Sequence, residues 1–366
     1  MTRVAIVKCK DYESARVEEA VKKAFGFLGG MERFVKKGER ALIKPNLLSA
    51  RLPEDGVCTH LEVIRAVVGL VRDCGAMPLI GDNPGGSIKP GQVYEGSGIA
   101  DFAKKQGIEL KETKDVKVIN GIPIASYFFE CDKIINLPKM KSHSLMGLTG
   151  AVKNMYGAVA GLHKSELHRR FPSPEEFTKV LVDTFEIVKP AVSLMDGIVA
   201  MDQAGPAAGR LKNTGLLLAG EDSVAIDSVF AALIGKKPLD ILTTKEARRR
   251  KLGEADLENI EISGEDIKES HIRDFELPGT PRLITALGPY AKFAGKFVKF
   301  GPAINKKLCR KCMICSDSCP VSAITINQES SAIDLEKCIR CMCCHEVCPH
   351  KAIKLRTNAL ARAFGL

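Results

Sequence analysis

Eight cysteines near the C-terminus recur at regular intervals. They form the spacing C-x2-C-x2-C-x3-C-P twice, 29 residues apart, and they are Cys309, Cys312, Cys315, Cys319, Cys338, Cys341, Cys344 and Cys348. The two copies also match beyond the cysteines, because CPVSAITI parallels CPHKAIKL. Three cysteines two residues apart let one loop wrap three iron atoms. The spacing therefore predicts an iron–sulfur domain formed by internal duplication.

Zinc is the alternative metal, because paired C-x2-C units also bind zinc. A zinc site needs neither the third C-x2-C step nor the Cys-Pro ending with an apolar strand after it. The spacing therefore favours iron–sulfur clusters over zinc.

The segment 306–357 resembles the bacterial two-cluster ferredoxins. The resemblance implies two 4Fe–4S clusters and electron transfer, with the fourth thiolate of each cluster supplied by the other copy. It assigns one cluster to Cys309, Cys312, Cys315 and Cys348, and the other to Cys338, Cys341, Cys344 and Cys319. Cys343 does not fit the pattern and is interpreted as a spare thiol. The remaining cysteines lack metal-ligand spacing and are interpreted as small buried residues, at Cys9, Cys58, Cys74 and Cys131.

A second concentration of polar chemistry lies between residues 137 and 168. Its cationic and imidazole side chains are Lys139, Lys141, His143, Lys153, His163, Lys164 and His168, and glycines stand at 147, 150, 157 and 161. Glycines beside cationic side chains allow the backbone to approach an anionic ligand closely. A solvated basic loop with helix-packing glycines is the alternative, since no residue here pairs with an obvious carboxylate in the sequence.

Strand and helix patterns alternate from residue 1 to about residue 275. They predict an α/β fold with a mostly parallel sheet and flanking helices, followed by a small α+β ferredoxin-like domain. The expected strands are 3–9, 40–44, 77–81, 125–129, 133–137, 192–196 and 214–219. The expected helices are 12–28, 60–74 (with Thr59 as its N-cap), 174–188, 223–233 and 241–250.

Polar side chains follow several of these strands, in the loops 44–51, 82–89 and 137–150. Because ligands bind beyond the carboxyl ends of parallel strands, we expect these side chains to converge on one site that one cluster faces. The expected catalytic residues are His143, Lys153 and Asp82. The expected cofactor-binding or substrate-binding residues are Lys44, Asn46, Asn83, Gly147, Gly150 and Asn154. An unperturbed pKa near 6.5 suits His143 to donate and accept protons, and Lys153 suits an anionic group.

Three further carboxylates were weighed. Asp196 and Asp202 flank a glycine after a strand, and one of them suits a general acid/base or a cation ligand, with a solvated turn acid as the alternative. Asp227 is interpreted as a helix-face residue. The loop that begins at Asp82 equally suits a tight turn.

Residues 1–275 resemble the family called domain of unknown function 362. The segments that carry the resemblance are 44–46, 59–60, 81–85, 138–143, 149–157 and 196–206. Many members carry a C-terminal two-cluster ferredoxin, so the resemblance implies an iron–sulfur protein typical of anaerobes without supplying a reaction. The spacing of His143, Gly147, Gly150 and Lys153 also looks like a segment of the lactate racemase family, which implies a nickel-pincer nucleotide as an alternative ligand.

The stretch 276–305 is interpreted as an amphipathic linker. Phe293, Phe297 and Phe300 fall at i, i+4 and i+7, and lysines repeat that spacing one residue earlier. This stripe suits packing against protein, with a membrane-surface helix as the alternative. Residues 358–366 form a tail.

Composition narrows the functional classes further. A formal charge of +10 with 5% aromatic residues favours a solvated basic surface over nucleic-acid binding. No export signal or membrane span is evident, so we expect a cytoplasmic protein with free or metal-bound thiols. Basic residues near the clusters suggest a redox partner with an acidic face.

Three hypotheses follow. The first is an oxidoreductase that passes electrons between the clusters and a small molecule or organic cofactor in the α/β domain. The second is an electron-transfer adapter without its own chemistry, and the third is a non-redox or nickel-pincer-like enzyme with accessory clusters. NAD and ATP lack motif support, whereas a flavin remains compatible with the sequence.

Overall fold

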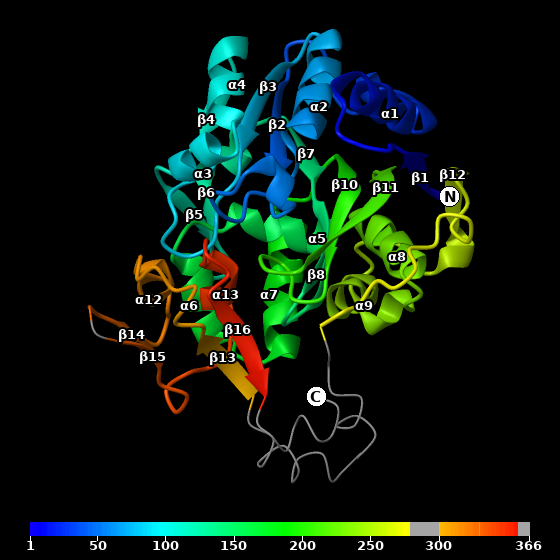
Figure 1. Cartoon of the computed structure of the whole chain (residues 1–366). Coiled ribbons are helices and arrows are strands. Elements are labelled where there is room, and N and C mark those ends of the chain that lie inside the picture. Colours follow the sequence, from blue (N-terminus) through cyan, green and yellow to red (C-terminus); the bar gives the residue numbers. More distant parts are fainter. Residues whose placement is uncertain (279–299, 329, 358–366) are drawn as a thin grey trace.

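The computed structural model describes residues 1–278, 300–328 and 330–357 (Figure 1). A twisted sheet runs through the larger domain. In spatial order its main strands are β12 (Ile260–Gly264), β1 (Thr2–Lys8), β11 (Arg210–Gly220), β10 (Val192–Asp202), β7 (Lys133–Leu137), β2 (Arg40–Pro45), β3 (Met77–Gly81) and β4 (Glu109–Lys111). β11 is antiparallel to both of its neighbours, and the other pairings along this path are parallel. The mostly parallel α/β fold is thus confirmed.

Two short strands extend the sheet toward the smaller domain. β8 (Lys139–His143) runs parallel to β10, and β9 (Gly147–Thr149) turns back against β8. Every residue of β8 is buried, although its sequence is Lys-Met-Lys-Ser-His. Its polar side chains must therefore find partners inside the protein.

Helices cover both faces of the sheet, because alternate residues of each strand point to opposite sides. Ala41 and Ile43 of β2 share a core with α1 (Ser14–Phe27), α2 (Leu61–Asp73), α3 (Pro90–Gly96) and α4 (Ile99–Gln106). Leu42, between them, joins a second core with α7 (Pro174–Ile187), α8 (Ser223–Leu233) and α9 (Leu242–Arg249). The remaining elements are the hairpin β5 (Val116–Ile119) and β6 (Ile122–Ala125), with α5 (Ala151–Asn154) and α6 (His163–Arg170).

The smaller domain shows the internal duplication in its structure. It pairs β13 (Phe300–Ile304) with β16 (Ile353–Thr357) and β14 (Ile324–Ile326) with β15 (Ser331–Ile333). Each copy contributes one short helix at the same point of its cysteine motif, α12 (Ile314–Asp317) and α13 (Cys343–Val347).

The two domains are in direct contact along α13 and the end of α12. His345 Nε2 lies 3.1 Å from the carbonyl of Ala204, and Arg51 donates to the carbonyl of Cys348 at 3.1 Å. The Ser318 hydroxyl accepts from the backbone N–H of Ser87 at 3.1 Å. A Cβ on Gly86, whose φ is +58°, would lie 2.2 Å from the Ser318 hydroxyl, so a glycine is needed for this approach.

Several local expectations differ from the structure. Residues 126–129, expected within a strand, form a 3-10 turn after β6. Thr59 is not the N-cap of α2: the His60 ring accepts the Glu62 N–H, while the Thr59 hydroxyl donates to Leu137 O at 2.6 Å. The predicted amphipathic linker helix lies outside the described residues, except that Phe300–Ile304 form β13 and extend the small domain toward the N-terminus.

Candidate functional site

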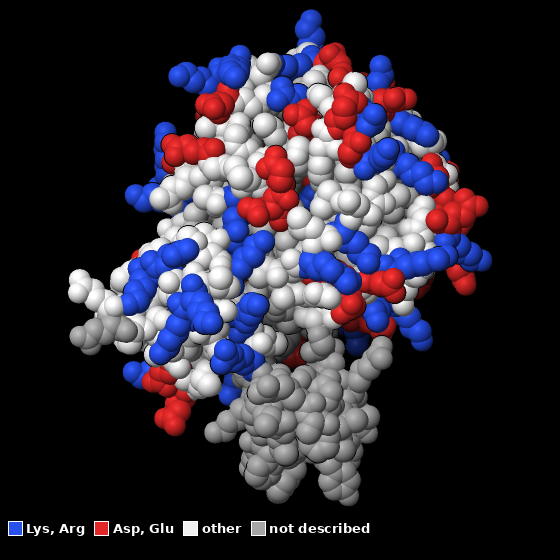
Figure 2. Space-filling view, in the orientation of Figure 1, with Lys and Arg blue, Asp and Glu red and all other residues white. Residues whose placement is uncertain are grey.

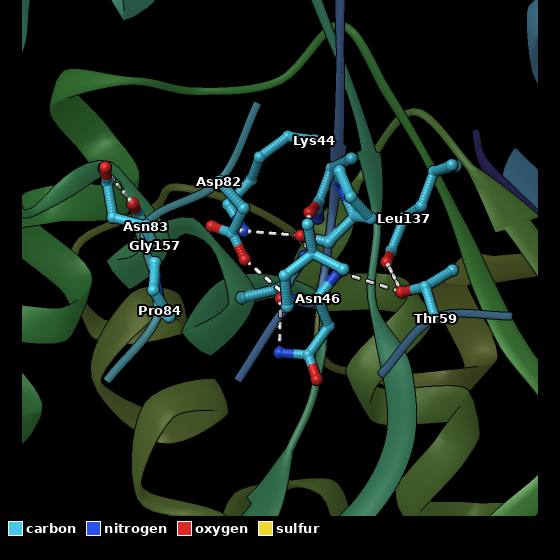
Figure 3. Close-up of polar contacts among 12 residues, drawn as sticks. Lys44, Asn46, Thr59, Asp82, Asn83, Pro84, Leu137 and Gly157 are labelled. Atoms are coloured by element: carbon cyan, nitrogen blue, oxygen red, sulfur yellow. Dashed lines mark hydrogen bonds and ion pairs between the residues drawn. The ribbon is translucent and has the colours of Figure 1, made fainter. Parts of the chain in front are cut away.

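A buried ion pair stands where β2 and β3 end (Figure 3). Lys44 Nζ lies 2.7 Å from Asp82 Oδ1, and the other carboxylate oxygen of Asp82 accepts the Leu47 N–H at 2.8 Å. Burial lowers the pKa of Lys44, and the charge of Asp82 opposes that shift. A Cβ on Gly157 would lie 1.9 Å from Asp82 Oδ1, so only glycine leaves room for this pair.

Asparagine side chains connect the strand ends to one another. Asn46 donates to Asn154 at 3.0 Å, and Asn154 donates to Asn136 of β7 at 2.7 Å. Lys141 Nζ donates to Asn46 Oδ1 at 2.7 Å and to the Val57 carbonyl. Asn83 donates to the Gly157 carbonyl at 2.8 Å. These amides therefore hold the loops in place through hydrogen bonds within the protein.

His143 ends β8 and faces the smaller domain. Its Nδ1 accepts two backbone N–H groups, from Leu145 at 3.1 Å and Met146 at 3.2 Å. In the neutral ring the proton is therefore on Nε2, which lies 3.0 Å from Glu346 Oε1 of α13, although the N–H is not aligned for a regular hydrogen bond. Burial, aided by the charge of Lys153, lowers the pKa of His143 to about 4. His143 is therefore neutral at pH 7.

A cavity of about 70 Å³ lies between the two domains. The α/β domain contributes Asp82, Asn83, Asn46, Asn154, Lys153, Thr149, Tyr156, Lys164, Ser165 and His168 among others, and α13 contributes Cys343, Glu346 and Val347. Burial would raise the pKa of Glu346, but His143, Lys153 and His168 together hold it well below its usual range. The cavity thus has an anionic carboxylate from one domain and cations from the other.

Two lysines give the cavity its positive charge. Among the described residues, Lys153 forms no ion pair within 4 Å, and burial lowers its pKa. Lys164 Nζ is held by the carbonyls of Asn83 and Pro84, and burial lowers its pKa to about 8. A wider, shallower pocket of about 530 Å³ shares Asn83 and Gly86 with the cavity and provides an approach from solvent.

The cysteines of the two motifs lie close enough to influence one another's pKa. Burial raises the pKa of Cys315, and negative charge on three neighbouring thiols, those of Cys348, Cys312 and Cys309, raises it further. Burial likewise raises the pKa of Cys344, with added effects from Cys341, Cys315, Cys338 and Cys319. In the described part of the chain, no three His, Cys, Asp or Glu side chains converge as ligands of a single metal ion do. The eight thiols influence one another across both copies of the motif.

A small hollow in the smaller domain is lined by the second thiol set, the four cysteines expected to hold the second cluster. Its walls contain Cys319, Cys338, Cys341 and Cys344 and the apolar residues Val321, Ile324, Ile333 and Ile339. Cys343 lines this hollow as well as the interdomain cavity, and its thiol is hydrogen-bonded to that of Cys341. One residue therefore separates the thiol set from the cavity.

The expected site residues are distributed unevenly around the cavity. Asp82, Asn83, Asn46, Lys153 and Asn154 line it, Lys44 pairs with Asp82, and His143 reaches it through Glu346. Gly147 and Gly150 are not among its lining residues. A Cβ on Gly150 would lie 2.1 Å from the Asp227 carboxylate, so this glycine makes room for Asp227.

The carboxylates weighed from the sequence are all buried. Asp227 accepts the N–H groups of Ala151 and Val152, and burial raises its pKa to about 7. Asp196 lies 2.7 Å from Lys139 Nζ and accepts the Tyr12 hydroxyl at 2.8 Å. Asp202 binds Arg210 at 2.7 Å. Asp227 thus lies on a helix face as expected, on the buried face of α8 (Ser223–Leu233).

Sequence reasoning missed Glu346, Cys343 and the partner role of Lys141 and Lys139. A signal existed for the first two, since both lie in the second cysteine motif and Cys343 departs from the ferredoxin pattern. No sequence signal linked α13 to β8, because 203 residues separate His143 from Glu346.

Within the described residues, no helix is long and apolar enough to cross a membrane. Two family models match the chain: domain of unknown function (DUF362) over residues 41–232, and 4Fe-4S dicluster domain over residues 301–349. The thylakoid-associated protein sll1697 of Synechocystis is 32% identical over 67% of this chain and 78% of its own length.

Two solved structures are more distant. A protein of Thermotoga maritima is 14% identical with a TM-score of 0.32, covering 53% of this chain and 52% of that one. The lactate racemase apoprotein of Thermoanaerobacterium thermosaccharolyticum is 12% identical with a TM-score of 0.37, covering 61% of this chain and 55% of that one. This chain thus spans about half the length of these two proteins. From the matches over residues 41–232 and 301–349, the chain belongs to the family described as domain of unknown function (DUF362) and carries a C-terminal 4Fe-4S dicluster domain.

Proposed function

We propose that this protein is an iron–sulfur oxidoreductase whose substrate binds in the interdomain cavity. Two 4Fe–4S clusters, held by Cys309, Cys312, Cys315 and Cys348 and by Cys338, Cys341, Cys344 and Cys319, supply one-electron transfer. The observation that carries the proposal is that Cys343 lines both the cavity and the hollow of the second thiol set. An adapter without chemistry of its own has no need for a polar cavity at that position.

In this proposal the residues of the chain have separate tasks. Lys153 and Glu346 are the charged groups that contact the bound molecule. His143 is a positioning residue, because its Nε2–H faces Glu346 while two backbone N–H groups fix its tautomer. The Lys44–Asp82 pair fixes the wall where β2 and β3 end.

A redox partner protein delivers or removes the electrons at the other end of the small domain. Cys312 is exposed there. Figure 2 shows Lys and Arg side chains gathered over this side of the molecule. Exposed basic residues of the domain include Lys306, Lys307, Arg310, Lys311, Lys337, Lys354 and Arg356. These charges favour a partner with an acidic face, in the cytoplasm where thiols stay reduced.

The cavity size bears on the cofactor question. A volume of about 70 Å³ accommodates about five water-sized positions at roughly 10–15 Å³ each, which suits a small molecule. A flavin or a nickel-pincer nucleotide does not fit into it while the smaller domain is in contact with the α/β domain. We therefore propose direct transfer to substrate, without a further organic cofactor.

The test follows reoxidation of the chemically reduced protein under anaerobic conditions. A panel of short carboxylic acids, their 2-oxo derivatives and small oxyanions is added, and the visible spectrum reports the clusters. We expect at least one compound to reoxidise the wild type but not Lys153→Met. Equal reoxidation by a large one-electron dye would show that the variant's clusters are intact. If no compound acts and Lys153→Met behaves as wild type, the adapter hypothesis replaces this one.

A further inference from the structure

The interdomain cavity has more positive than negative charge around it. Lys153 and Lys164 line it, and Lys44 and Lys141 bind its lining residues Asp82 and Asn46, against the two carboxylates Asp82 and Glu346. Asp82 pairs with Lys44, and Glu346 faces the neutral His143 as well as Lys153. Lys141 and Lys164 have only amide and carbonyl partners among the described residues. Burying cations without counter-charge is costly, and burial lowers the pKa of Lys141 to about 7 and of Lys164 to about 8, so a bound anion would keep both lysines in their charged form.

The cysteine thiols are not among the groups that most influence Lys164. The groups that influence its ammonium are Asp82, Lys44, Lys153 and Glu346, with no cysteine among them. The thiol whose charge acts on Lys153 is that of Cys343, which lines the cavity from α13. The wall farther from the thiols therefore keeps its positive charge.

Two buried hydroxyls add an independent observation. Thr149 is 3% exposed and Ser165 is 4% exposed, and both line the cavity. Among the described residues neither hydroxyl has a hydrogen-bond partner. Buried polar groups are nearly always satisfied, so each hydroxyl indicates a ligand atom in the cavity.

We propose that the cavity binds a small oxyanion, contacted by Lys153, Lys164, Thr149 and Ser165. The inference rests on the proposed function in one respect: the anion is the molecule that exchanges electrons with the protein. A short dicarboxylate and a tetrahedral oxyanion share this chemistry, since both offer several acceptor oxygens within a few atoms. The shallow pocket beyond Asn83 and Gly86 is the path of entry.

Binding is tested by calorimetric titration of the full, anaerobically prepared protein. The probes are oxalate for the dicarboxylate, inorganic phosphate for the tetrahedral oxyanion, and oxamide as a neutral analogue of oxalate. We expect one of the two anions to bind and oxamide not to bind. Tight binding of oxamide, or of neither anion, would overturn the proposal.

Matched variants locate the site. Lys153→Met should weaken binding of the anion by about 10- to 100-fold and Thr149→Val by about 3- to 10-fold, as expected for a charged and a neutral hydrogen bond. Lys245→Met changes an exposed lysine on α9 and should leave binding unchanged. Equal effects of the Lys153 and Lys245 changes would place the anion elsewhere and refute the assignment.

The outcome is separable from the proposed function. If oxalate or phosphate binds with these variant effects but no compound of the reoxidation panel oxidises the reduced protein, the anion site stands and the redox proposal fails. If a neutral compound reoxidises the protein in a Lys153-dependent way, the redox proposal stands and the anion inference fails.

Discussion

The two copies of the cysteine motif have the same cysteine spacing but very different surroundings. Aligned by their cysteines, Ile314, Ser316 and Asp317 of the first copy correspond to Cys343, His345 and Glu346 of the second. Asp317 is exposed, whereas Glu346 lines the interdomain cavity and lies against His143. Cys343 and His345, which break the repeat, both contact the α/β domain or its cavity. In a duplicated domain, the positions that depart from the internal repeat indicate where the function lies.

The largest expected effect tests whether the second copy serves the cavity. Cys319→Ser removes a proposed ligand of the second cluster, so iron should fall from about eight to about four atoms per chain. Reoxidation by the substrate should be lost at the same time. Anaerobic iron and sulfide analysis with the spectral assay measures both.

The matched change in the other set is Cys348→Ser. It should also lower iron to about four atoms per chain, but through the first cluster. A full complement of iron in either variant, or zinc without sulfide in the wild type, would contradict the ferredoxin assignment.

The next effect compares two acids at equivalent positions. Glu346→Gln removes a buried negative charge that lies 3.0 Å from Nε2 of the neutral His143, and a hydrogen bond to a charged group contributes about 1.5–3 kcal/mol. Asp317→Asn changes an exposed side chain and should stay within about 0.5 kcal/mol. Anaerobic thermal unfolding compares the two. Similar shifts in both variants would show that α13 is not specially stabilised.

A smaller effect is expected at His345, which stands where the first copy has Ser316. His345 Nδ1 lies 2.8 Å from Ile353 O, and its Nε2 lies 3.1 Å from Ala204 O. His345→Ala loses both contacts, and leaving buried carbonyls unpaired should cost about 1–3 kcal/mol. Because only the Ala204 contact crosses between the domains, limited proteolysis should show faster release of the small domain. Unchanged proteolysis would mean that this contact does not hold the domains together.

The stability of the folded protein should depend on pH through His143, which lies at the contact between the two domains. Its pKa is lowered in the folded protein, so it contributes stability that is present above pH 6.5 and lost as pH falls toward about 4. The slope is about 1.4 kcal/mol per pH unit for one group. His143→Asn, which can still accept the Leu145 and Met146 N–H groups, should flatten the unfolding profile between pH 6.5 and 5. A profile as steep as that of the wild type would assign the dependence to other groups.

The smallest effect on stability is expected at Cys343. Cys343→Ile installs the residue of the first copy, keeps the site apolar and should leave the iron content unchanged. Because the thiol lines both hollows, we expect slower reoxidation by the substrate while dye reoxidation is unaffected. The reverse change, Ile314→Cys, serves as the control and should alter neither rate.

The fold could be predicted from the sequence more completely than the site. The alternation of strands such as 77–81 and 133–137 with helices predicts a mostly parallel sheet, and with it the common end at which Lys44 and Asp82 meet. The cysteine spacing is local and therefore visible in the sequence. By contrast, the approach of Glu346 to His143 depends on how two domains pack, which no local pattern encodes.

The burial of three lysines could not be predicted from the sequence either. Lys44, Lys139 and Lys141 are fully buried, although lysine is ordinarily a surface residue. The lysine-rich segment between residues 137 and 168 was therefore also compatible with a solvated basic loop. Only the tertiary structure shows that Lys139 and Lys141 within it are buried. The N-cap of α2 is His60 and not the expected Thr59 for a related reason. The Thr59 hydroxyl donates to the Leu137 carbonyl and accepts the Asn46 N–H instead.

One wall of the cavity is a helix of five residues, α13, set between cysteines of both thiol sets. So short a helix has little stability of its own, and metal binding is coupled to folding in such motifs. The binding site is therefore completed only when iron and sulfide have been inserted. Damage by oxygen would remove the electron carrier and the substrate pocket together, so chain made faster than its clusters are assembled would accumulate without a pocket.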